Sequence, residues 1–237
     1  SNAWGWAVKS IVKNDGNNTI YLLGIEWDYV NWNAVAAVYK SINNGETFEK
    51  ILAFNDDNGY DIWTSRYEAT DVYLIHNGNV YKISNTDELI EVGSFFPFGS
   101  GDNLLTGGVS DSGLFLYARI DERIYFSPDG GVSWEDKGIQ PQWTFMINSF
   151  NSSNIHSNII SLGGMEVFLS NNSGTSWNLV NHWYDYYNDP ESLLHADIPE
   201  IRFILDNNGE EFVLISTDGG LYVSYDYLEN NENLSLD

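Results

Sequence analysis

The octapeptide Ser127-Pro128-Asp129-Gly130-Gly131-Val132-Ser133-Trp134 brings a hydroxyl, a carboxylate and two glycines together, as a small nucleophilic site would. Two similar octapeptides, at 41–48 and 170–177, carry Asn43 and Asn172 where this one carries Asp129. An amide oxygen can accept a hydrogen bond as a carboxylate does, but it cannot act as a general base or a nucleophile. The comparison therefore favours a structural turn over chemistry.

We expect each octapeptide to form a hairpin between two strands. The Asp or Asn oxygen would accept hydrogen bonds from backbone N–H groups one or two residues ahead, and glycine would take a positive φ. The closing aromatic ring would fill the space between adjacent sheets. The residues assigned to these structural roles are Ser41, Asn43, Gly45, Phe48, Ser127, Asp129, Gly131, Trp134, Ser170, Asn172, Gly174 and Trp177.

Candidate ligand-binding residues gather instead in two aromatic and acidic segments. Aromatic rings offer flat faces to sugars or protein anchors, and acids offer hydrogen bonds or cation ligands. The residues are Trp183, Tyr184, Asp185, Tyr186, Tyr187, His195 and Asp197 in the first segment, and Trp27, Asp28 and Trp32 in the second. On a strand, His195 and Asp197 would face the same side and could pair. The alternative is that many of these rings are simply buried between sheets.

The elements that must position these residues follow from an internal repeat. Apolar–aromatic pairs recur at Val38-Tyr39, Val80-Tyr81, Ile124-Tyr125, Val167-Phe168 and Leu221-Tyr222, so the aromatic members are 42, 44, 43 and 54 residues apart. The longer last interval places about eleven extra residues near 181–197. Runs such as 6–13, 49–54, 89–95, 143–150 and 200–205 complete about four short strands per period.

Four short strands repeated at this spacing predict an all-β fold, a β-propeller of four-stranded antiparallel blades. We expect about five blades, near 4–57, 58–98, 99–139, 140–183 and 184–237. Ser1-Asn2-Ala3 has the composition of a scar left by removal of an expression tag. Function is then expected at the ends of the strands opposite the octapeptides, because rigid scaffolds carry their binding residues on loops.

The octapeptides resemble the Asp-box, or BNR, repeats that form propellers in sialidases, sortilin-like receptors, xyloglucan-degrading enzymes and secreted bacterial surface proteins. The stretch 194–226 is similar to large secreted bacterial proteins of this kind. The resemblance implies a bacterial, secreted, periplasmic or cell-surface protein. Such propellers usually have six or more blades. The chain is therefore either a fragment of a larger propeller, with the rest of a longer chain as a partner, or a propeller that closes with five blades, and the fragment is favoured.

Charge narrows the classes of partner. Thirty-four acidic and ten basic residues give a net charge of −24, which disfavours nucleic acid. No apolar run is long enough to predict membrane insertion. The acidity could attract Ca²⁺, and 55–61 is rich in oxygen ligands, but it lacks the loop pattern of an EF-hand. With no cysteine and no zinc spacing among the histidines, no metal site or cofactor is expected.

Three functions remain open from the sequence. The first is a non-catalytic module that binds a glycan or a protein through the 182–197 segment, and the second is a glycoside hydrolase, or part of one, with paired carboxylates. The third is a scaffold without a site. Sialidase activity is disfavoured. That chemistry needs three arginines that hold the substrate carboxylate, and the Arg-Ile-Pro motif usual in such enzymes is absent from this sequence. The chain has four arginines in all, Arg66, Arg119, Arg123 and Arg202.

Overall fold

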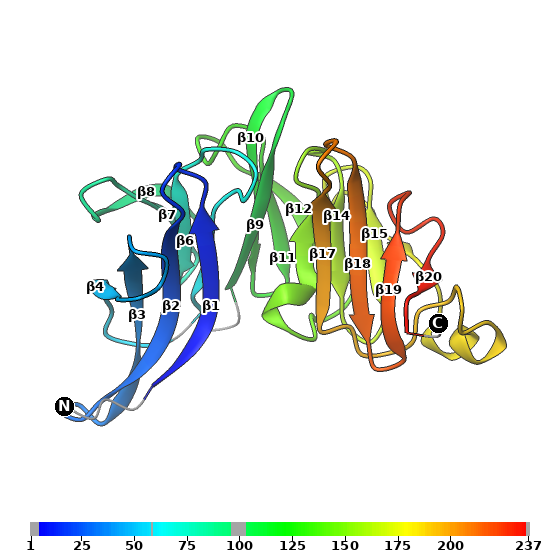
Figure 1. The fold of residues 1–237 in the computed structure, drawn as a ribbon, viewed down its shortest axis with the longest axis horizontal. Helices are drawn as coiled ribbons and strands as arrows, with labels where there is room; N and C mark the ends of the chain where they lie inside the picture. Colours follow the sequence, from blue (N-terminus) through cyan, green and yellow to red (C-terminus); the bar gives the residue numbers. More distant parts are fainter. Residues whose placement is uncertain (1–4, 58, 96–102, 236–237) are drawn as a thin grey trace. The chain divides into compact units, whose positions relative to one another are not determined.

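The computed structural model describes residues 5–57, 59–95 and 103–235 (Figure 1). The expected tag scar at 1–3 lies outside these residues. The strands are β1 Gly5–Lys13, β2 Thr19–Asp28, β3 Asn33–Ser41, β4 Glu49–Ala53, β5 Asp61–Trp63, β6 Val72–His76, β7 Asn79–Ile83, β8 Leu89–Ser94, β9 Asn103–Ser110, β10 Gly113–Ile120, β11 Arg123–Ser127, β12 Glu135–Ile139, β13 Phe150–Ser152, β14 Ile160–Gly163, β15 Val167–Ser170, β16 Asn178–Leu179, β17 Glu200–Leu205, β18 Glu211–Thr217, β19 Gly220–Ser224 and β20 Glu232–Asn233.

The strands form five sheets of four, and each sheet consists of four consecutive strands in sequence order. The pairings between neighbouring strands are antiparallel. In the described part of the chain the helical elements are two 3₁₀ segments, η1 Ile147–Ser149 and η2 Trp183–Asn188. The predicted all-β fold of four-stranded antiparallel sheets is confirmed.

The chain divides into two compact units. Unit 1 comprises residues 1–105, 118–121 and 129–134, and unit 2 comprises 106–117, 122–128 and 135–237. In unit 1 a buried core lies between the first two sheets, with Leu23, Val38 and Ile62 among its members. In unit 2 a second core includes Val167, Ile215 and Tyr222.

The repeated apolar–aromatic pairs lie on the third strand of each sheet, and the two members point to opposite faces because strand residues alternate. In unit 1, Val38 belongs to the core shared with the second sheet, and Tyr81 of that second sheet packs against the same core. In unit 2, Val167 and Tyr222 meet in the other core in the same way. In each of these two pairs of sheets, the first member on the earlier sheet faces the later sheet, and the aromatic member on the later sheet faces the earlier one.

The octapeptides form the turns between the third and fourth strands. Oδ1 of Asn43 accepts a hydrogen bond from the backbone N–H of Thr47 at 3.0 Å, and Oδ1 of Asn172 does the same from Ser176 at 2.9 Å. Oδ1 of Asp129 accepts from the N–H of Ser133 at 2.8 Å. The bonded N–H lies four residues ahead, not one or two as expected, because the side chain spans the whole turn.

The last turn keeps this geometry although its sequence has diverged. Asp226 accepts from the N–H of Asn230 at 2.9 Å, and Oγ of Ser224 accepts from the N–H of Leu228 at 2.8 Å. Leu228 stands where other turns have glycine and adopts a φ of 71°. Its side chain is buried in the core of unit 2, and this packing offsets a left-handed backbone that a bulky residue rarely adopts.

The closing aromatic residues differ in their surroundings. Trp134 donates its indole N–H to the carbonyl oxygen of Val92 at 3.3 Å and packs edge-on against Phe95, so it lies on the preceding sheet. Trp177 is partly buried. Phe48, which was expected to fill a space between sheets, is 42% exposed, because no described sheet of unit 1 lies on that side of β1–β4.

Replacing Asn172 with alanine should lower the free energy of unfolding by about 1 kcal/mol, because the N–H of Ser176 loses its acceptor. Asn172→Asp should stay within roughly 0.5 kcal/mol of the parent, since a carboxylate fills this position at Asp129 and Asp226. Urea unfolding of the two variants measures both values. Equal losses from the two variants would contradict the assigned role of the side-chain oxygen.

One expected strand is wrong in part. The run 143–150 was expected to be a strand, but the strand begins only at Phe150. The N–H of Phe145 bonds to the carbonyl oxygen of Gly163 at 3.0 Å, outside any ladder, and η1 follows. The apolar residues before β13 thus belong to a loop that lies beside the β14–β15 turn.

Candidate functional site: the loop edge of unit 2

The predicted segment 182–197 lies at the end of the sheets opposite the octapeptide turns. Strand β15 runs from the 164–166 turn to the octapeptide turn that begins at Ser170, and β19 runs from the 218–219 turn to the turn that begins at Ser224. The N–H groups of Asp197 and Asp218 bond to the carbonyl oxygens of Met165 and Ala196, at 3.2 and 3.3 Å. We call residues 142–146, 163–166, 181–198 and 217–219 the loop edge.

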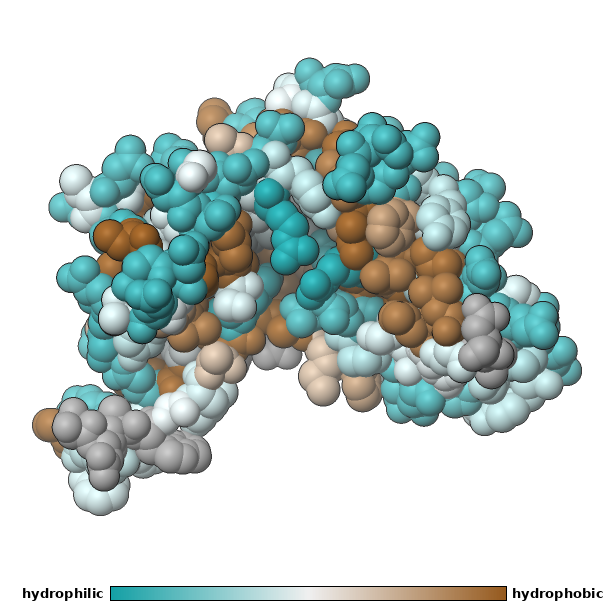
Figure 2. All heavy atoms as spheres, in the orientation of Figure 1, coloured by the Kyte–Doolittle hydropathy of each residue, from teal (hydrophilic) through white to brown (hydrophobic). Residues whose placement is uncertain are grey.

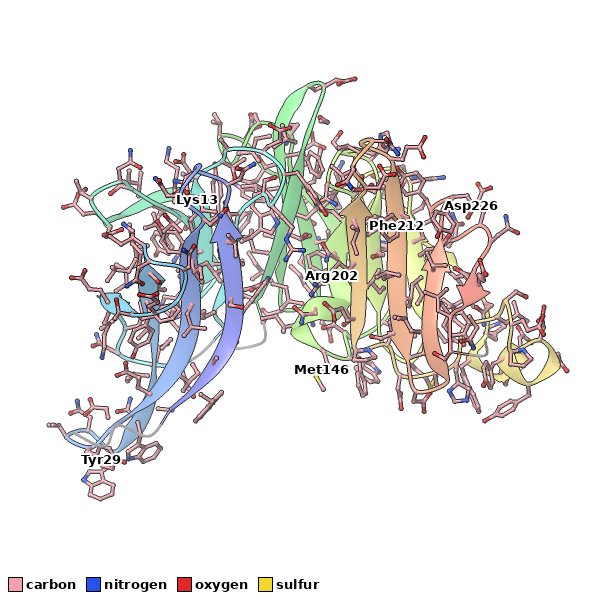
Figure 3. The ribbon with its side chains drawn as sticks, viewed as in Figure 1. Lys13, Tyr29, Met146, Arg202, Phe212 and Asp226 are labelled. Atoms are coloured by element: carbon pink, nitrogen blue, oxygen red, sulfur yellow. The ribbon has the colours of Figure 1, made fainter. Side chains whose placement is uncertain are left out.

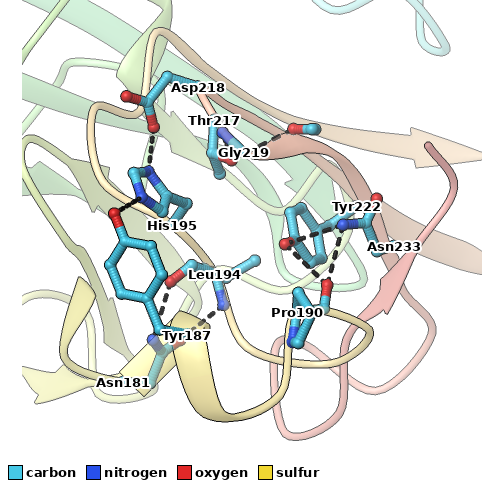
Figure 4. A network of polar contacts seen from close by, with 11 residues as sticks. Asn181, Tyr187, Pro190, Leu194, His195, Thr217, Asp218, Gly219, Tyr222 and Asn233 are labelled. Atoms are coloured by element: carbon cyan, nitrogen blue, oxygen red, sulfur yellow. Dashed lines mark hydrogen bonds and ion pairs between the residues drawn. The ribbon is translucent and has the colours of Figure 1, made fainter. Parts of the chain in front are cut away.

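The inserted loop is closed at its base and tied to the last sheet (Figure 4). Asn181 bonds both the carbonyl oxygen and the N–H of Leu194, at 3.0 and 3.1 Å. The carbonyl oxygen of Pro190 accepts from the Tyr222 hydroxyl at 3.2 Å and from Nδ2 of Asn233 at 2.9 Å. Four side-chain hydrogen bonds therefore hold a loop that carries η2 and little other regular structure.

His195 organises the rings of this loop. Its Nδ1 contacts Asp218 and its Nε2 lies 3.1 Å from the Tyr187 hydroxyl (Figure 4). The rings of Trp183, Tyr186 and Tyr187 pack edge-on around the imidazole. A Cβ at Gly219 would lie 2.5 Å from Cβ of His195, so this close approach needs glycine. The imidazole is thus a structural centre for the aromatic cluster.

The expected pairing of His195 with Asp197 is wrong. Asp197 does not lie on a strand, and it adopts a φ of 60°. The strand alternation that would have placed His195 and Asp197 on the same side is therefore absent. The carboxylate partner is Asp218, in the β18–β19 turn. The repeat could have indicated Asp218, because it places every turn between a second and a third strand at the same end of the sheets as 182–197.

The cluster presents exposed aromatic surface. Tyr184 and Tyr187 are 51% and 68% exposed, and the Tyr184 ring stacks on His182 with centroids 5.0 Å apart and an interplanar angle of 12°. Oε1 of Glu166 lies 3.1 Å from Nδ1 of His182 and accepts the N–H of Trp183 at 3.2 Å. A carboxylate that the sequence did not single out therefore sets the position of the stack.

Three further exposed apolar side chains extend the surface: Trp143, Met146 and Met165. Met146 projects from its loop beyond the ends of the strands (Figure 3). The loop edge also contains Glu166, Asp185, Asp189, Glu191, Asp197 and Asp218, but neither lysine nor arginine. It is therefore an aromatic surface with an acidic character.

The second predicted segment, 26–33, lies in unit 1 at the β2–β3 turn. Asp28 accepts the N–H of Val30 at 2.8 Å and Nδ2 of Asn31 at 2.7 Å, and these hydrogen bonds hold the pKa of Asp28 below its usual range. Trp27 is partly buried, whereas Trp32 is exposed with a φ of 58°. Tyr29 is also exposed, and it marks the far tip of the hairpin (Figure 3). Asp28 thus builds the turn, and the free surface there is apolar.

The oxygen-rich run 55–61 does not gather its acids. Asp61 is buried and pairs with Lys9 at 2.8 Å, and Asp56 lies 4.0 Å from His76. Within the residues that the structure describes, no group of three or more His, Asp or Glu side chains is placed to hold a metal ion.

Comparisons with known proteins identify the fold and nothing finer. No protein-family model matches the chain, and no curated protein matches its sequence. Among solved structures, an oligogalacturonate lyase in complex with manganese superposes with a TM-score of 0.57 at 11% identity, over 99% of this chain and 67% of that one. The chain is a β-propeller.

Two other propellers are similar. The extracellular domain of a protein from B. thetaiotaomicron, described as a one-component system, gives a TM-score of 0.55 at 9% identity, over 92% of this chain and 32% of that one. YCF48 bound to D1 peptide gives 0.51 at 13% identity, over 98% and 72%. At these identities the likeness shows the shared fold alone.

Three of the six acids at the propeller's loop edge are engaged locally. Glu166 contacts His182 and the Trp183 N–H, Asp218 contacts His195, and Asp189 bonds Ser192. Paired-carboxylate hydrolysis needs two acids that face each other at about 5–10 Å across the scissile bond. Glu166 and Asp218 hold the rings of His182 and His195 in place. None of the described helical segments could cross a membrane.

Proposed function

We propose that this propeller is a non-catalytic binding module whose ligand, a glycan or a protein segment, contacts the loop edge of unit 2. The observation that carries the proposal is the exposed stack of Tyr184 on His182 beside Tyr187, held by Glu166 and His195. Exposed rings fixed in place provide contact area with little loss of side-chain entropy on binding.

A glycan is our first choice of ligand. The face of a sugar ring packs on a flat aromatic face, and the neighbouring acids and amides can accept its hydroxyl hydrogen bonds. The fold is compatible with this ligand, since an oligogalacturonate lyase shares it. The resemblance of its octapeptides to Asp-box repeats supports a role outside the cytoplasm.

A protein segment is the second choice, and two exposed methionines favour it. Met146 and Met165 add flexible apolar surface of the kind found on adaptable protein-binding faces. The same fold occurs in YCF48, a structure of which contains the D1 peptide. Because the loop edge is rich in acids and contains neither lysine nor arginine, we expect it to prefer a basic protein segment.

The test is binding of the folded chain to an array of defined glycans, followed by calorimetric titration with the best glycan. Tyr184→Ala and Tyr187→Ala should each weaken binding at least fivefold, because each removes about 1 kcal/mol or more of stacking. Tyr225→Ala is the matched control, since Tyr225 is at least as exposed as Tyr184 and Tyr187 but lies at the octapeptide end. Binding that survives both loop-edge substitutions would contradict the proposal.

A further inference from the structure

Asp218 fixes where the ring of His195 carries its proton. Nδ1 of the imidazole contacts the Asp218 carboxylate, and a carboxylate can only accept a hydrogen bond. Nδ1 therefore carries the proton, and Nε2 of the neutral imidazole is left as an acceptor. The ring is held in this orientation, because the His195 side chain is only 14% exposed and the rings of Trp183, Tyr186 and Tyr187 pack edge-on around it.

The Tyr187 hydroxyl gives its only proton to this imidazole. Its oxygen lies 3.1 Å from Nε2 of His195, and Nε2 has no proton to donate across that distance (Figure 4). The hydroxyl is therefore the donor, which leaves its oxygen with lone pairs and no free proton. Tyr187 is one of the exposed aromatic residues of the loop edge. Toward a ligand, its hydroxyl is a hydrogen-bond acceptor.

The charged groups of the loop edge favour the same kind of ligand. Its six carboxylates can only accept hydrogen bonds, and the loop edge contains neither lysine nor arginine. Figure 2 shows mostly hydrophilic and near-white side chains over the inserted loop, at the lower right of the view. A ligand with neutral hydroxyl groups therefore finds acceptors here, whereas a ligand carboxylate finds no lysine or arginine.

We propose that the ligand of the loop edge is a neutral glycan, not a uronic-acid glycan, and that Tyr187 selects it by accepting a hydrogen bond from a sugar hydroxyl. This inference rests on the proposed function, because it names the class of glycan that the same site binds. The C6 carboxylate of a uronate can only accept hydrogen bonds, and it brings a negative charge next to the acids of the loop edge. Asp218 and His195 are positioning residues, since they act through the Tyr187 hydroxyl.

Pairs of matched glycans test the class of ligand with the folded chain. Hexasaccharides of glucose, galactose and mannose are each titrated beside the same hexasaccharide with its C6 hydroxymethyl groups oxidised to carboxylates. At least one neutral hexasaccharide should bind about tenfold more tightly than its oxidised counterpart. The preference should persist at about 500 mM sodium chloride, where long-range repulsion from the net charge of −24 is screened.

The two ways in which this experiment can fail are distinguishable. Equal or tighter binding of the oxidised hexasaccharides overturns the inference and leaves the proposed function standing. Absence of binding by every glycan, neutral or oxidised, contradicts the proposed function as well.

Two variants separate the proton arrangement from the charge of the loop edge. In Asp218→Asn the amide N–H can donate to Nδ1 of His195, so the imidazole proton moves to Nε2 and the Tyr187 hydroxyl proton turns toward the ligand. The preference for the neutral glycan should then fall about fivefold. Asp185→Asn is the matched control: it removes the same charge from the inserted loop and should leave that preference unchanged. Equal effects of the two variants overturn the role of Asp218.

Tyr187→Phe keeps the aromatic ring and removes the acceptor. It should weaken binding of the neutral hexasaccharide about fivefold, because one hydrogen bond to the glycan is lost while the stacking surface remains. If this variant bound the neutral glycan as tightly as the parent does, the hydroxyl would not be the selecting group.

Nitrogen-15 NMR of the histidine rings measures the proton arrangement without any glycan. At about pH 8, where an ordinary imidazole is neutral, the ring of His195 should carry its proton on Nδ1 in the parent and on Nε2 in a larger share of Asp218→Asn molecules. A parent ring that is protonated on Nε2 overturns the proposal, whatever the glycan titrations give.

Discussion

Replacing Asp61 with alanine should destabilise the chain by about 3–5 kcal/mol, because it breaks a buried ion pair on one side only. Asp61 begins β5 in unit 1 and is 1% exposed. Its oxygens accept Nζ of Lys9 at 2.8 Å and the backbone N–H groups of Ile62 and Leu105 at 2.7 and 2.9 Å. The substitution leaves one cation and two donors without this acceptor.

The size of this effect does not mean that the ion pair is itself strongly stabilising. Burial raises the pKa of Asp61, and the attraction of Lys9 only partly opposes that cost. Asp61→Asn should therefore cost less than the alanine variant, since an amide keeps one acceptor and needs no charge in the interior. Asn151 bonds the N–H of the next residue in the same way at the start of a later sheet.

Urea unfolding measures these differences. The control is Asp136→Ala, which removes an exposed pair with Arg123 at 2.6 Å and should cost no more than about 1 kcal/mol. If Asp61→Ala and Asp136→Ala were equally destabilising, the buried pair would not have the structural role assigned to it.

The second large effect is expected at Tyr222. Its ring is fully buried in the core of unit 2, so Tyr222→Ala should cost about 3–5 kcal/mol through the cavity it leaves. The Tyr222 hydroxyl also bonds the carbonyl oxygen of Pro190, which helps to hold the inserted loop. Tyr222→Phe should cost only about 1 kcal/mol, because Asn233 still donates to the same oxygen.

Hydrogen–deuterium exchange separates the two consequences. Tyr222→Ala should speed exchange across 183–193 as well as lower global stability, whereas Tyr222→Phe should leave the loop nearly as protected as in the parent. If the alanine variant lost stability while the loop kept its protection, the link between the last sheet and the loop edge would be wrong.

The repeat was readable from the sequence because each sheet must bury two faces against its neighbours. The Val80-Tyr81 pair of β7 shows this alternation, since Val80 is fully buried and Tyr81 packs against the core shared with the first sheet. The turns were readable because a short side-chain oxygen is needed at one position, as at Asn43 and Asp129. The turn residues and the two-residue alternation of the strands were therefore enough to predict the architecture.

The candidate site was only partly predictable, because the residues that contact one another there come from separate turns. The sequence marked Tyr184, Tyr187 and His195, but it paired His195 with a neighbour two residues away instead of Asp218. Glu166 was missed for the same reason, since nothing near it in the sequence indicates contact with His182. Leu228 shows a further limit: burial can hold a left-handed backbone that local preference would assign to glycine.

The central claim is that a ligand contacts the propeller at the loop edge, away from the octapeptide turns. The most direct test is hydrogen–deuterium exchange of the chain with and without the glycan that binds best on the array. The account predicts slower exchange in 182–188 and 217–219 and no change in 170–176 or 224–230. Protection confined to the octapeptide turns would contradict it.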